Sequence, residues 1–500
     1  MSLKMDFSTD ACNANFPHPA ERSGTVMNKT AKRRFSGAFE IFKTILLVLL
    51  VISLIVLVVV YIRGMKVYEN TVMKKKQNES FDKLWSVQSG IQPEGINSDH
   101  LLPEFVGYKQ STFMSPRGCV GDADSVAELY ELVKPCIIEL FGSEAVCRDL
   151  SIDNGADAFE RAKKSDEFIY IRYHVPVLYQ LIYAFAADTL TVSESDVAVG
   201  GDGNISAYVS ELIIVPDKDF AAHRFVAYAS DGAGRYFEFR PAQHIVTSGF
   251  YISKLADGAQ NIEAYGFDFI DGTNIAVADA EIECSVISKS TSDYSEQADR
   301  NALLRLFKYN PDKLDWYTDG EVDVYIDSHS QLRIGDGSIS FSTSDSLEDS
   351  GGTMRGIEIE TLLGYTGDGA PSLFDKLSAV DNLVGRLGDI SPSLVGGAAT
   401  PCLGDVYADK SLLTVEYFLT HNNIRIGTEP YLRAVITENT ISEIELMPVS
   451  VTGTEETVLV PKPMYIVRKL DVLGKLPEGA IKAVSLNYTD GNAEWTVSAK

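Results

Sequence analysis

The sequence predicts a mixed α+β protein, in which a single N-terminal transmembrane helix is followed by two mostly antiparallel α+β extracytoplasmic domains. Residues 44–62, TILLVLLVISLIVLVVVYI, form a run of 19 residues without a charge. The chain beyond it contains many short stretches of alternating apolar and polar residues and a few longer stretches with helical periodicity. Short turn signals separate many of the strand-like stretches, which is typical of antiparallel pairing.

Residues 1–43 are predicted to be a disordered cytoplasmic tail. As a helix, residues 44–62 would be about 29 Å long at ~1.5 Å per residue, enough to cross a bilayer once. The apolar run is longer than that of a signal peptide and Arg63 follows without a small-residue cleavage site, which favours an uncleaved anchor. Basic residues flank the span on both sides. We expect the short tail inside the cell and the large remainder outside, although the cluster at 74–76 favours the opposite orientation.

The charge balance argues against nucleic acid as a partner. Of 44 Lys/Arg and 70 Asp/Glu, eight and four lie in residues 1–63, which leaves 36 bases and 66 acids in the rest of the chain. Such an excess of negative charge repels phosphate backbones and anionic headgroups.

Residues 63–120 are predicted to form a juxtamembrane stalk, since Pro93, Gly95, Pro103 and Gly107 are spaced as breakers of regular structure. The first α+β domain is predicted over 121–289.

The first domain is expected to open with a helix over 124–142, capped by Asp124 or Ser125, which Pro135 should kink or divide. A strand ending at His174 should lead into a second helix with Pro176 in its first turn. A strand over 207–217 and a hairpin around DGAG at 231–234 follow. The polar segment 288–297 is predicted to separate this domain from the second, over 298–500.

The second domain begins with a stretch rich in carboxylates. Residues 315–342 contain Asp315, Asp319, Asp323, Asp327 and Asp336, together with Glu321. Apolar residues alternate between these acids, which predicts a meander of short strands with the acids in turns and on solvent faces. The spacing does not fit an EF-hand loop, while a calcium site assembled from two adjacent turns stays open as an alternative.

The rest of the second domain should contain a helix over 371–388, a Gly-rich linker over 393–404, and strands from 411 to the C-terminus.

No motif for catalysis, cofactor binding or metal binding is present, so we predict a non-catalytic protein without a cofactor. The seven histidines are scattered, no C-x-x-C pair occurs, and the S-x-x-K string at 80–83 lacks its partner motifs. For Cys119, Cys136 and Cys147, one disulfide and buried free thiols are both open.

Two strings resemble the YycH/YycI family of membrane-anchored accessory regulators of a Gram-positive cell-wall sensor kinase. LFKYNPDKLDWYTDGEVDVYIDSHSQLRIGDGSISFS, at 306–342, is similar to the family's aromatic, Asp-Gly turn and strand pair. IKAVSLNYTDGNAEWTVSA, at 481–499, is similar to the closing strands of the family. The resemblance covers roughly residues 160–500, with 298–500 as a YycI-like domain, and the anchor.

The resemblance implies a regulator that binds and modulates a cell-envelope two-component sensor histidine kinase, with a related YycH/YycI-type protein as a further partner. In the span that inserts into the lipid bilayer, Ser53 and Tyr61 are the candidate partner contacts, although a plain lipid-facing anchor is equally open. The alternative function is an extracytoplasmic binding module for a cell-wall glycan or peptide.

Overall fold

We describe the protein from a computed structural model. The structure describes residues 97–499 apart from 113, 143–144, 188–198, 201–206, 218–224, 242–254, 256, 292–296, 313–314, 328–329, 336, 344–355, 365–370, 410–411 and 473–480. These residues all belong to one compact unit, Leu84–Lys500. Within them no helix is long and apolar enough to cross a membrane. The predicted tail, the span at 44–62 and the predicted contacts Ser53 and Tyr61 lie outside the described residues.

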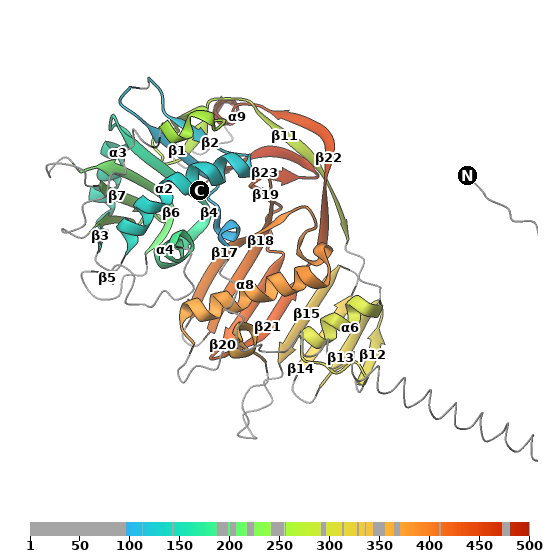
Figure 1. The fold of residues 1–500 in the computed structure, drawn as a ribbon. Helices are drawn as coiled ribbons and strands as arrows, with labels where there is room; N and C mark the ends of the chain where they lie inside the picture. The colour runs from blue at the N-terminus through green and yellow to red at the C-terminus, as the bar shows by residue number, and fades with distance from the viewer. Residues whose placement is uncertain are drawn as a thin grey trace, which may run out of the picture. The chain divides into compact units, whose positions relative to one another are not determined.

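The N-terminal half of the unit is built on one ten-stranded sheet, ordered β10-β9-β2-β1-β4-β6-β7-β8-β3-β5 (Figure 1). Its strands are β1 (Phe105–Lys109), β2 (Arg117–Cys119), β3 (Val146–Leu150), β4 (Phe168–Leu178), β5 (Val199–Gly200), β6 (Tyr208–Pro216), β7 (Phe225–Ser230), β8 (Tyr236–Arg240), β9 (Tyr265–Phe269) and β10 (Ala276–Ala278). The predicted hairpin is confirmed as β7 and β8.

Helices pack on both faces of this sheet. They are η1 (Ser98–Leu101), α2 (Ala123–Phe141), α3 (Ile152–Lys163), α4 (Tyr179–Ala187) and η3 (Ala259–Asn261). Phe239 of β8 packs against Phe141 of α2, with ring centroids 4.6 Å apart. Tyr236, three residues earlier in β8, lies on the other face, against Phe159 of α3. Since side chains alternate along a strand, a single strand supports both helical layers.

The C-terminal half is built on a twelve-stranded sheet with the main order β12-β13-β14-β15-β21-β20-β18-β19-β23-β24. Its strands are β12 (Asp315–Asp319), β13 (Val322–Ile326), β14 (Ser330–Gly335), β15 (Ser338–Thr343), β16 (Ile357–Glu358), β17 (Thr400–Asp409), β18 (Leu412–His421), β19 (Ile424–Ile426), β20 (Leu432–Thr437), β21 (Thr440–Leu446), β23 (Ile481–Thr489) and β24 (Asn492–Ala499). Its helices are α6 (Gln297–Leu306), α7 (Ile359–Leu363), α8 (Leu373–Ile390), η4 (Pro392–Val395) and α9 (Pro463–Val472).

The predicted meander over 315–342 and the predicted helix over 371–388 are confirmed as β12 to β15 and as α8. Ser372 and Asp375 form a reciprocal capping box at the start of α8. The mixed α+β class with mostly antiparallel pairing is confirmed as well: in the described residues, only β3–β5 and β19–β23 pair in parallel as strands.

A long two-stranded ribbon accompanies the two large sheets. It pairs β11 (Ile282–Thr291) with β22 (Val449–Val460) in antiparallel register. The first residues of the segment 288–297, predicted to separate the two domains, therefore belong to strand β11. The predicted domain limits, 121–289 and 298–500, stay a prediction.

Two prolines behave differently from the sequence-based expectation. Pro135 does not divide its helix, since α2 runs unbroken from Ala123 to Phe141 and is capped by Asp122 rather than by the expected residues. Pro176 lies in β4, not in the helix that follows. The β4–β6 register shifts between Arg172 and Val177, so Pro176 falls where the regular ladder is interrupted and its missing N–H costs no ladder bond.

Two segments predicted as connections contain strands. Residues 98–119, assigned to the stalk, form η1, β1 and β2, and β1 lies between β2 and β4 in the sheet. Gly107 lies inside β1 rather than at a break in the chain. Glycine suits this position because a Cβ there would come within 2.5 Å of the Phe267 ring. The Gly-rich segment 393–404 continues into β17, where Gly404 likewise leaves room for the ring of Phe418.

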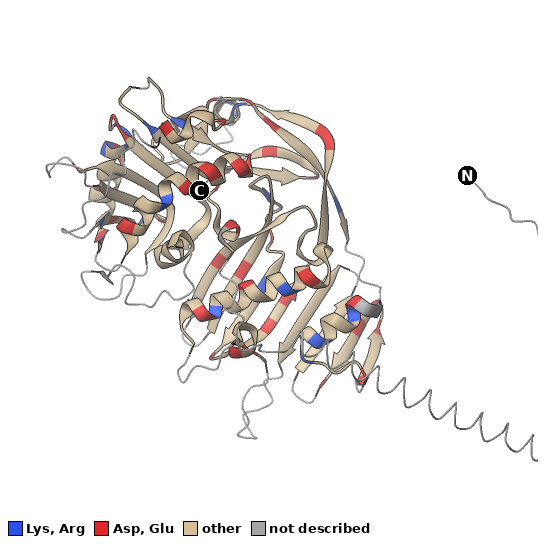
Figure 2. Ribbon diagram, viewed as in Figure 1, with Lys and Arg blue, Asp and Glu red and all other residues tan. Residues whose placement is uncertain are grey.

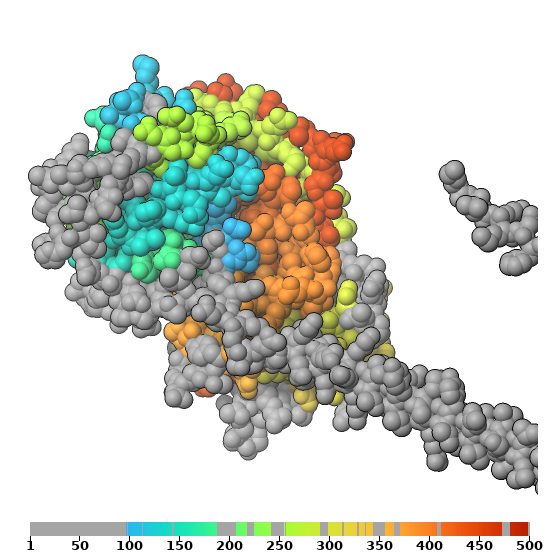
Figure 3. Space-filling view, viewed as in Figure 1, coloured from blue at the N-terminus to red at the C-terminus, as the bar shows by residue number. Residues whose placement is uncertain are grey.

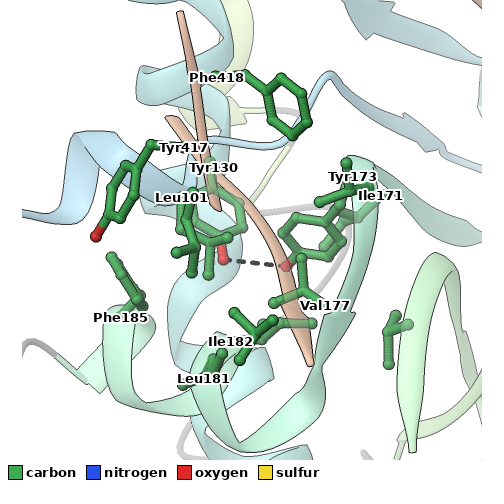
Figure 4. Close-up of a cluster of buried hydrophobic side chains, with 14 of the residues drawn as sticks. Leu101, Tyr130, Ile171, Tyr173, Val177, Leu181, Ile182, Phe185, Tyr417 and Phe418 are labelled. Atoms are coloured by element: carbon green, nitrogen blue, oxygen red, sulfur yellow. Dashed lines mark hydrogen bonds between the residues drawn. The ribbon is translucent and has the colours of Figure 1, made fainter. Parts of the chain in front are cut away.

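A common hydrophobic core joins the two halves. Figure 4 shows Tyr417 and Phe418 of β18 beside side chains of α2, β4 and α4, together with the hydrogen bond between Tyr130 and Tyr173, whose hydroxyl oxygens are 3.2 Å apart. In the space-filling view, the blue-to-green surface of the N-terminal half meets the orange surface of the C-terminal half directly (Figure 3). Burial of these side chains in one core explains why residues from both halves form one compact unit.

Candidate functional site

A buried cluster of polar groups connects η1, α8 and β18. The carboxyl of Asp381, on α8, is hydrogen-bonded to His100 Nδ1 at 2.5 Å, to the backbone N–H of Asn97 at 3.0 Å and to the hydroxyl of Tyr417 at 2.9 Å. His100 and Asp381 are each less than a tenth exposed. With its hydrogen bonds satisfied, this carboxyl fixes the start of the N-terminal half to the C-terminal sheet.

A second buried network lies close to the same junction between the N-terminal half and the C-terminal sheet. The Nε of Arg172 donates to Glu104 at 3.0 Å, and its Nη1 donates to the carbonyl of Ala276 at 2.8 Å. Burial raises the pKa of Glu211 to about 7, and the hydrogen bond from Ser230 and the charge of Arg172 counteract that rise only in part. Glu211 is therefore a buried carboxyl that changes its charge near neutral pH.

Contacts across the junction continue through Asn423, which precedes β19. Its side-chain amide donates to the carbonyl of Pro103 at 2.6 Å, and its Oδ1 is hydrogen-bonded to His174 Nε2 at 3.0 Å. Burial lowers the pKa of His174 below its usual value. A neutral imidazole suits this position, because a charged one would have to be desolvated.

An exposed edge strand is the first surface feature. All five residues of β12 are exposed, and within the described residues β12 pairs only with β13. Trp316 is 59% exposed and Tyr317 is 49% exposed. Trp316 stacks on Tyr325 with ring centroids 6.2 Å apart, so its indole is held in place on the surface. Rigid exposed aromatics at an open sheet edge are typical of protein-binding surfaces.

The second surface feature is the face of the C-terminal sheet that turns away from α8. Tyr417 contacts α8 through its hydroxyl, so its neighbours Glu416 and Phe418 point to the opposite face. In register with Glu416 on that face lie Arg433 of β20, Glu445 of β21 and Ser340 of β15. Figure 2 shows acidic residues on neighbouring strands of this sheet. This face is therefore polar and charged, in contrast to the apolar face under α8.

A hollow of about 640 Å³ opens on this charged face, between β15, β17, β18, β20, β21 and the loop at 428–430. We call it the sheet hollow. Arg425 of β19 lies in it, with its guanidinium carbon 3.4 Å from the centroid of the Phe418 ring. Its Nη2 donates to the carbonyl of Thr428 at 2.8 Å, and its Nε is buried without a partner. Burial lowers the pKa of Arg425.

The carboxylates of the sheet hollow are only loosely neutralised. Arg433 approaches Glu416 at 3.8 Å and Glu445 at 3.5 Å. Asp405 accepts a hydrogen bond from the Tyr407 hydroxyl at 2.8 Å. Burial, followed by the nearby charge of Asp405, raises the pKa of Glu416. The hollow thus combines a desolvated cation, Arg425, and the more exposed Arg433 with an excess of carboxylates, namely Asp405, Glu416, Glu429 and Glu445.

The acids of the predicted meander are distributed over strands and turns. Asp315 and Asp319 lie on the exposed β12, and Glu321 is exposed in the turn that follows. Asp323 differs from the expectation, because its carboxyl is paired with Arg300 of α6 at 2.7 Å and is mostly covered. Asp336 lies outside the described residues. Among the residues that the structure describes, no group of three His, Cys, Asp or Glu side chains is arranged to hold a metal ion.

The five described cysteines, Cys119, Cys136, Cys147, Cys284 and Cys402, are buried free thiols. Of the two alternatives for Cys119, Cys136 and Cys147, the structure therefore has the free thiols. Burial raises the pKa of the Cys147 thiol to about 12 and that of the Cys119 thiol to about 12.

Sequence reasoning did not find the sheet hollow or the exposed aromatic pair on β12. An arginine inside the short strand IRI was the available signal for the hollow, since charged residues in a strand interior usually face solvent or a partner. The hollow itself is assembled from strands far apart in sequence, so no local pattern indicates it.

The structure is similar to a solved one, the crystal structure of YycH from Bacillus subtilis, which bears the name of the family that the sequence resembles. The TM-score is 0.46 and the identity is 11%, and the match covers 81% of this chain and 95% of that chain. No protein-family model and no curated protein matches the chain.

Proposed function

We propose that the protein is a non-catalytic, membrane-anchored regulator that binds and modulates a cell-envelope sensor histidine kinase. The resemblance of the strings at 306–342 and 481–499 and the predicted span at 44–62 support this proposal. The structural observation that carries it is the exposed edge strand β12 with its two surface aromatics, Trp316 and Tyr317.

The chemistry of β12 suits a protein partner that adds a strand. An open edge offers backbone N–H and C=O groups to an incoming strand, and the flanking side chains supply specificity. Trp and Tyr bury large areas at interfaces at a low entropic cost. Asp315 and Asp319 lie at the two ends of β12, and Glu321 follows directly. The complementary partner is therefore an extracytoplasmic segment of the kinase with an exposed strand and basic side chains.

The test is co-purification of the kinase from native membranes with the full chain carrying Trp316→Ala and Tyr317→Ala. If the two rings anchor the interface, we expect the recovered kinase to fall at least about tenfold, because truncated aromatic anchors typically cost 2 kcal/mol or more. The matched control is Tyr465→Ala, since Tyr465 is 57% exposed and lies on α9. Undiminished recovery with the double variant would contradict a role for β12.

The span is expected to contribute to the same complex through Ser53 and Tyr61. Replacing residues 44–62 with an unrelated apolar span should weaken co-purification, because packing and polar contacts between transmembrane helices would be lost. Ser53→Ala and Tyr61→Phe in the native span test the two polar contacts separately. Equal recovery with the unrelated span would refute a transmembrane contribution while leaving the β12 contact intact.

A further inference from the structure

The sheet hollow contains a cation, Arg425, and two carboxylates, Asp405 and Glu416, that influence its pKa without forming an ion pair with it. Among the described residues, no carboxylate lies within ion-pair distance of the Arg425 guanidinium. Its Nη2 has a neutral carbonyl as partner, and its Nε is buried without one. A guanidinium that has lost much of its water is stabilised by an anion that accepts its remaining N–H groups.

The same hollow contains more carboxylates than cations, and two of the carboxylates, Asp405 and Glu416, have no ion pair shorter than 3.8 Å among the described residues. Asp405 has no Lys or Arg at ion-pair distance within the described part of the chain, and its hydrogen bond comes from a neutral hydroxyl. Burial and the negative charges of Asp405 and Glu429 raise the pKa of Glu416, while the charges of Arg433, at 3.8 Å, and Arg425 lower it. A ligand cation near Asp405 and Glu416 would relieve their repulsion.

The hollow has room for a small molecule that carries both charges. Its volume of about 640 Å³ lies in the range of small-molecule sites, about 300–1,000 Å³. The face of Phe418 orients the guanidinium, and Gly404 allows that ring to lie close to β17, since a Cβ there would come within 2.3 Å of it. The cationic group is therefore held in place before any ligand arrives.

We propose that the sheet hollow binds a small zwitterion, an α-amino acid or a short peptide with free ends, with its carboxylate on Arg425 and its ammonium group near Asp405 and Glu416. This inference is independent of the partner that β12 binds. It assigns to the protein a ligand site on the C-terminal sheet, separate from the exposed edge.

The proposal is tested by calorimetric titration of the full chain in detergent with alanyl-alanine, in its L,L and D,D forms. We expect saturable binding of at least one form. We expect at least tenfold weaker binding of the same dipeptide when its ends are blocked by acetyl and amide groups. Binding of neither free form up to about 10 mM, a concentration at which even millimolar sites are mostly filled, would overturn the proposal. Equal binding of free and blocked dipeptides would overturn it as well.

The variants separate loss of the site from loss of the fold. Arg425→Gln and Asp405→Asn should each weaken binding of the free dipeptide at least tenfold. Arg333→Gln is the matched control, because Arg333 lies on the same sheet face but outside the hollow. If Arg425→Gln disturbs folding, as judged by circular dichroism, the dipeptide affinity of the Asp405→Asn variant decides whether the hollow is the binding site. Asp405 is partly exposed, so its replacement is less damaging to the fold. Unchanged affinity in a folded Asp405→Asn variant would contradict the assigned role of the hollow.

Discussion

Replacing Asp381 with alanine tests whether the buried carboxyl on α8 holds the two halves of the unit together. The substitution removes the acceptor of hydrogen bonds from His100, Tyr417 and the backbone of Asn97. A buried donor left without a partner costs about 1–3 kcal/mol. Because the site can relax and admit water, we expect a total loss of about 3–5 kcal/mol in the free energy of unfolding, as for removal of one partner of a buried pair.

The measurement is urea unfolding of the full chain in detergent, followed by far-UV circular dichroism, with the free energy extrapolated to zero denaturant. Ser378→Ala is the matched control. Ser378 lies one turn earlier on α8, is buried, and its hydroxyl oxygen has no hydrogen-bond partner. Its replacement should change the stability by less than about 0.5 kcal/mol, since no hydrogen bond is lost and alanine favours the helix. A loss below about 1 kcal/mol for Asp381→Ala would refute the reasoning.

Two further predictions concern titration and thiol reactivity. Because burial raises the pKa of Glu211 to about 7, the folded state holds this proton more tightly than the unfolded state. The resulting stability is complete below the unfolded pKa, near 4.3, and is lost progressively as the pH rises from there through the folded pKa of about 7, by about 4 kcal/mol in total. Glu211→Gln should therefore match the wild type at pH 4 and exceed it at pH 8 in urea unfolding, and identical pH profiles would exclude this cause. Because burial raises the thiol pKa values, as for Cys402 to about 12, iodoacetamide should label the five described cysteines only after unfolding, as read by mass spectrometry. Labelling of Cys147 in the native protein would show that its burial is incomplete.

Local patterns predicted the elements whose periodicity decides their structure. The alternation in 315–342 is enough to specify β12 to β15, and the apolar stripe after Ser372 is enough to specify α8. The prolines were predicted less well, because their effect depends on pairing. Pro176 is tolerated in β4 where the register with β6 shifts, and the sequence does not contain that register.

The sequence by itself determined the mixed α+β class, the excess of negative charge outside residues 1–63 and the prediction of a membrane span at 44–62. These properties depend on composition and on short-range periodicity, which a single chain displays directly. Only the tertiary structure decided that Trp316 stands on an exposed edge and that Arg425, Asp405 and Glu416 line one hollow. Such sites arise from strand order and register, since these bring side chains from distant segments onto one face of a sheet.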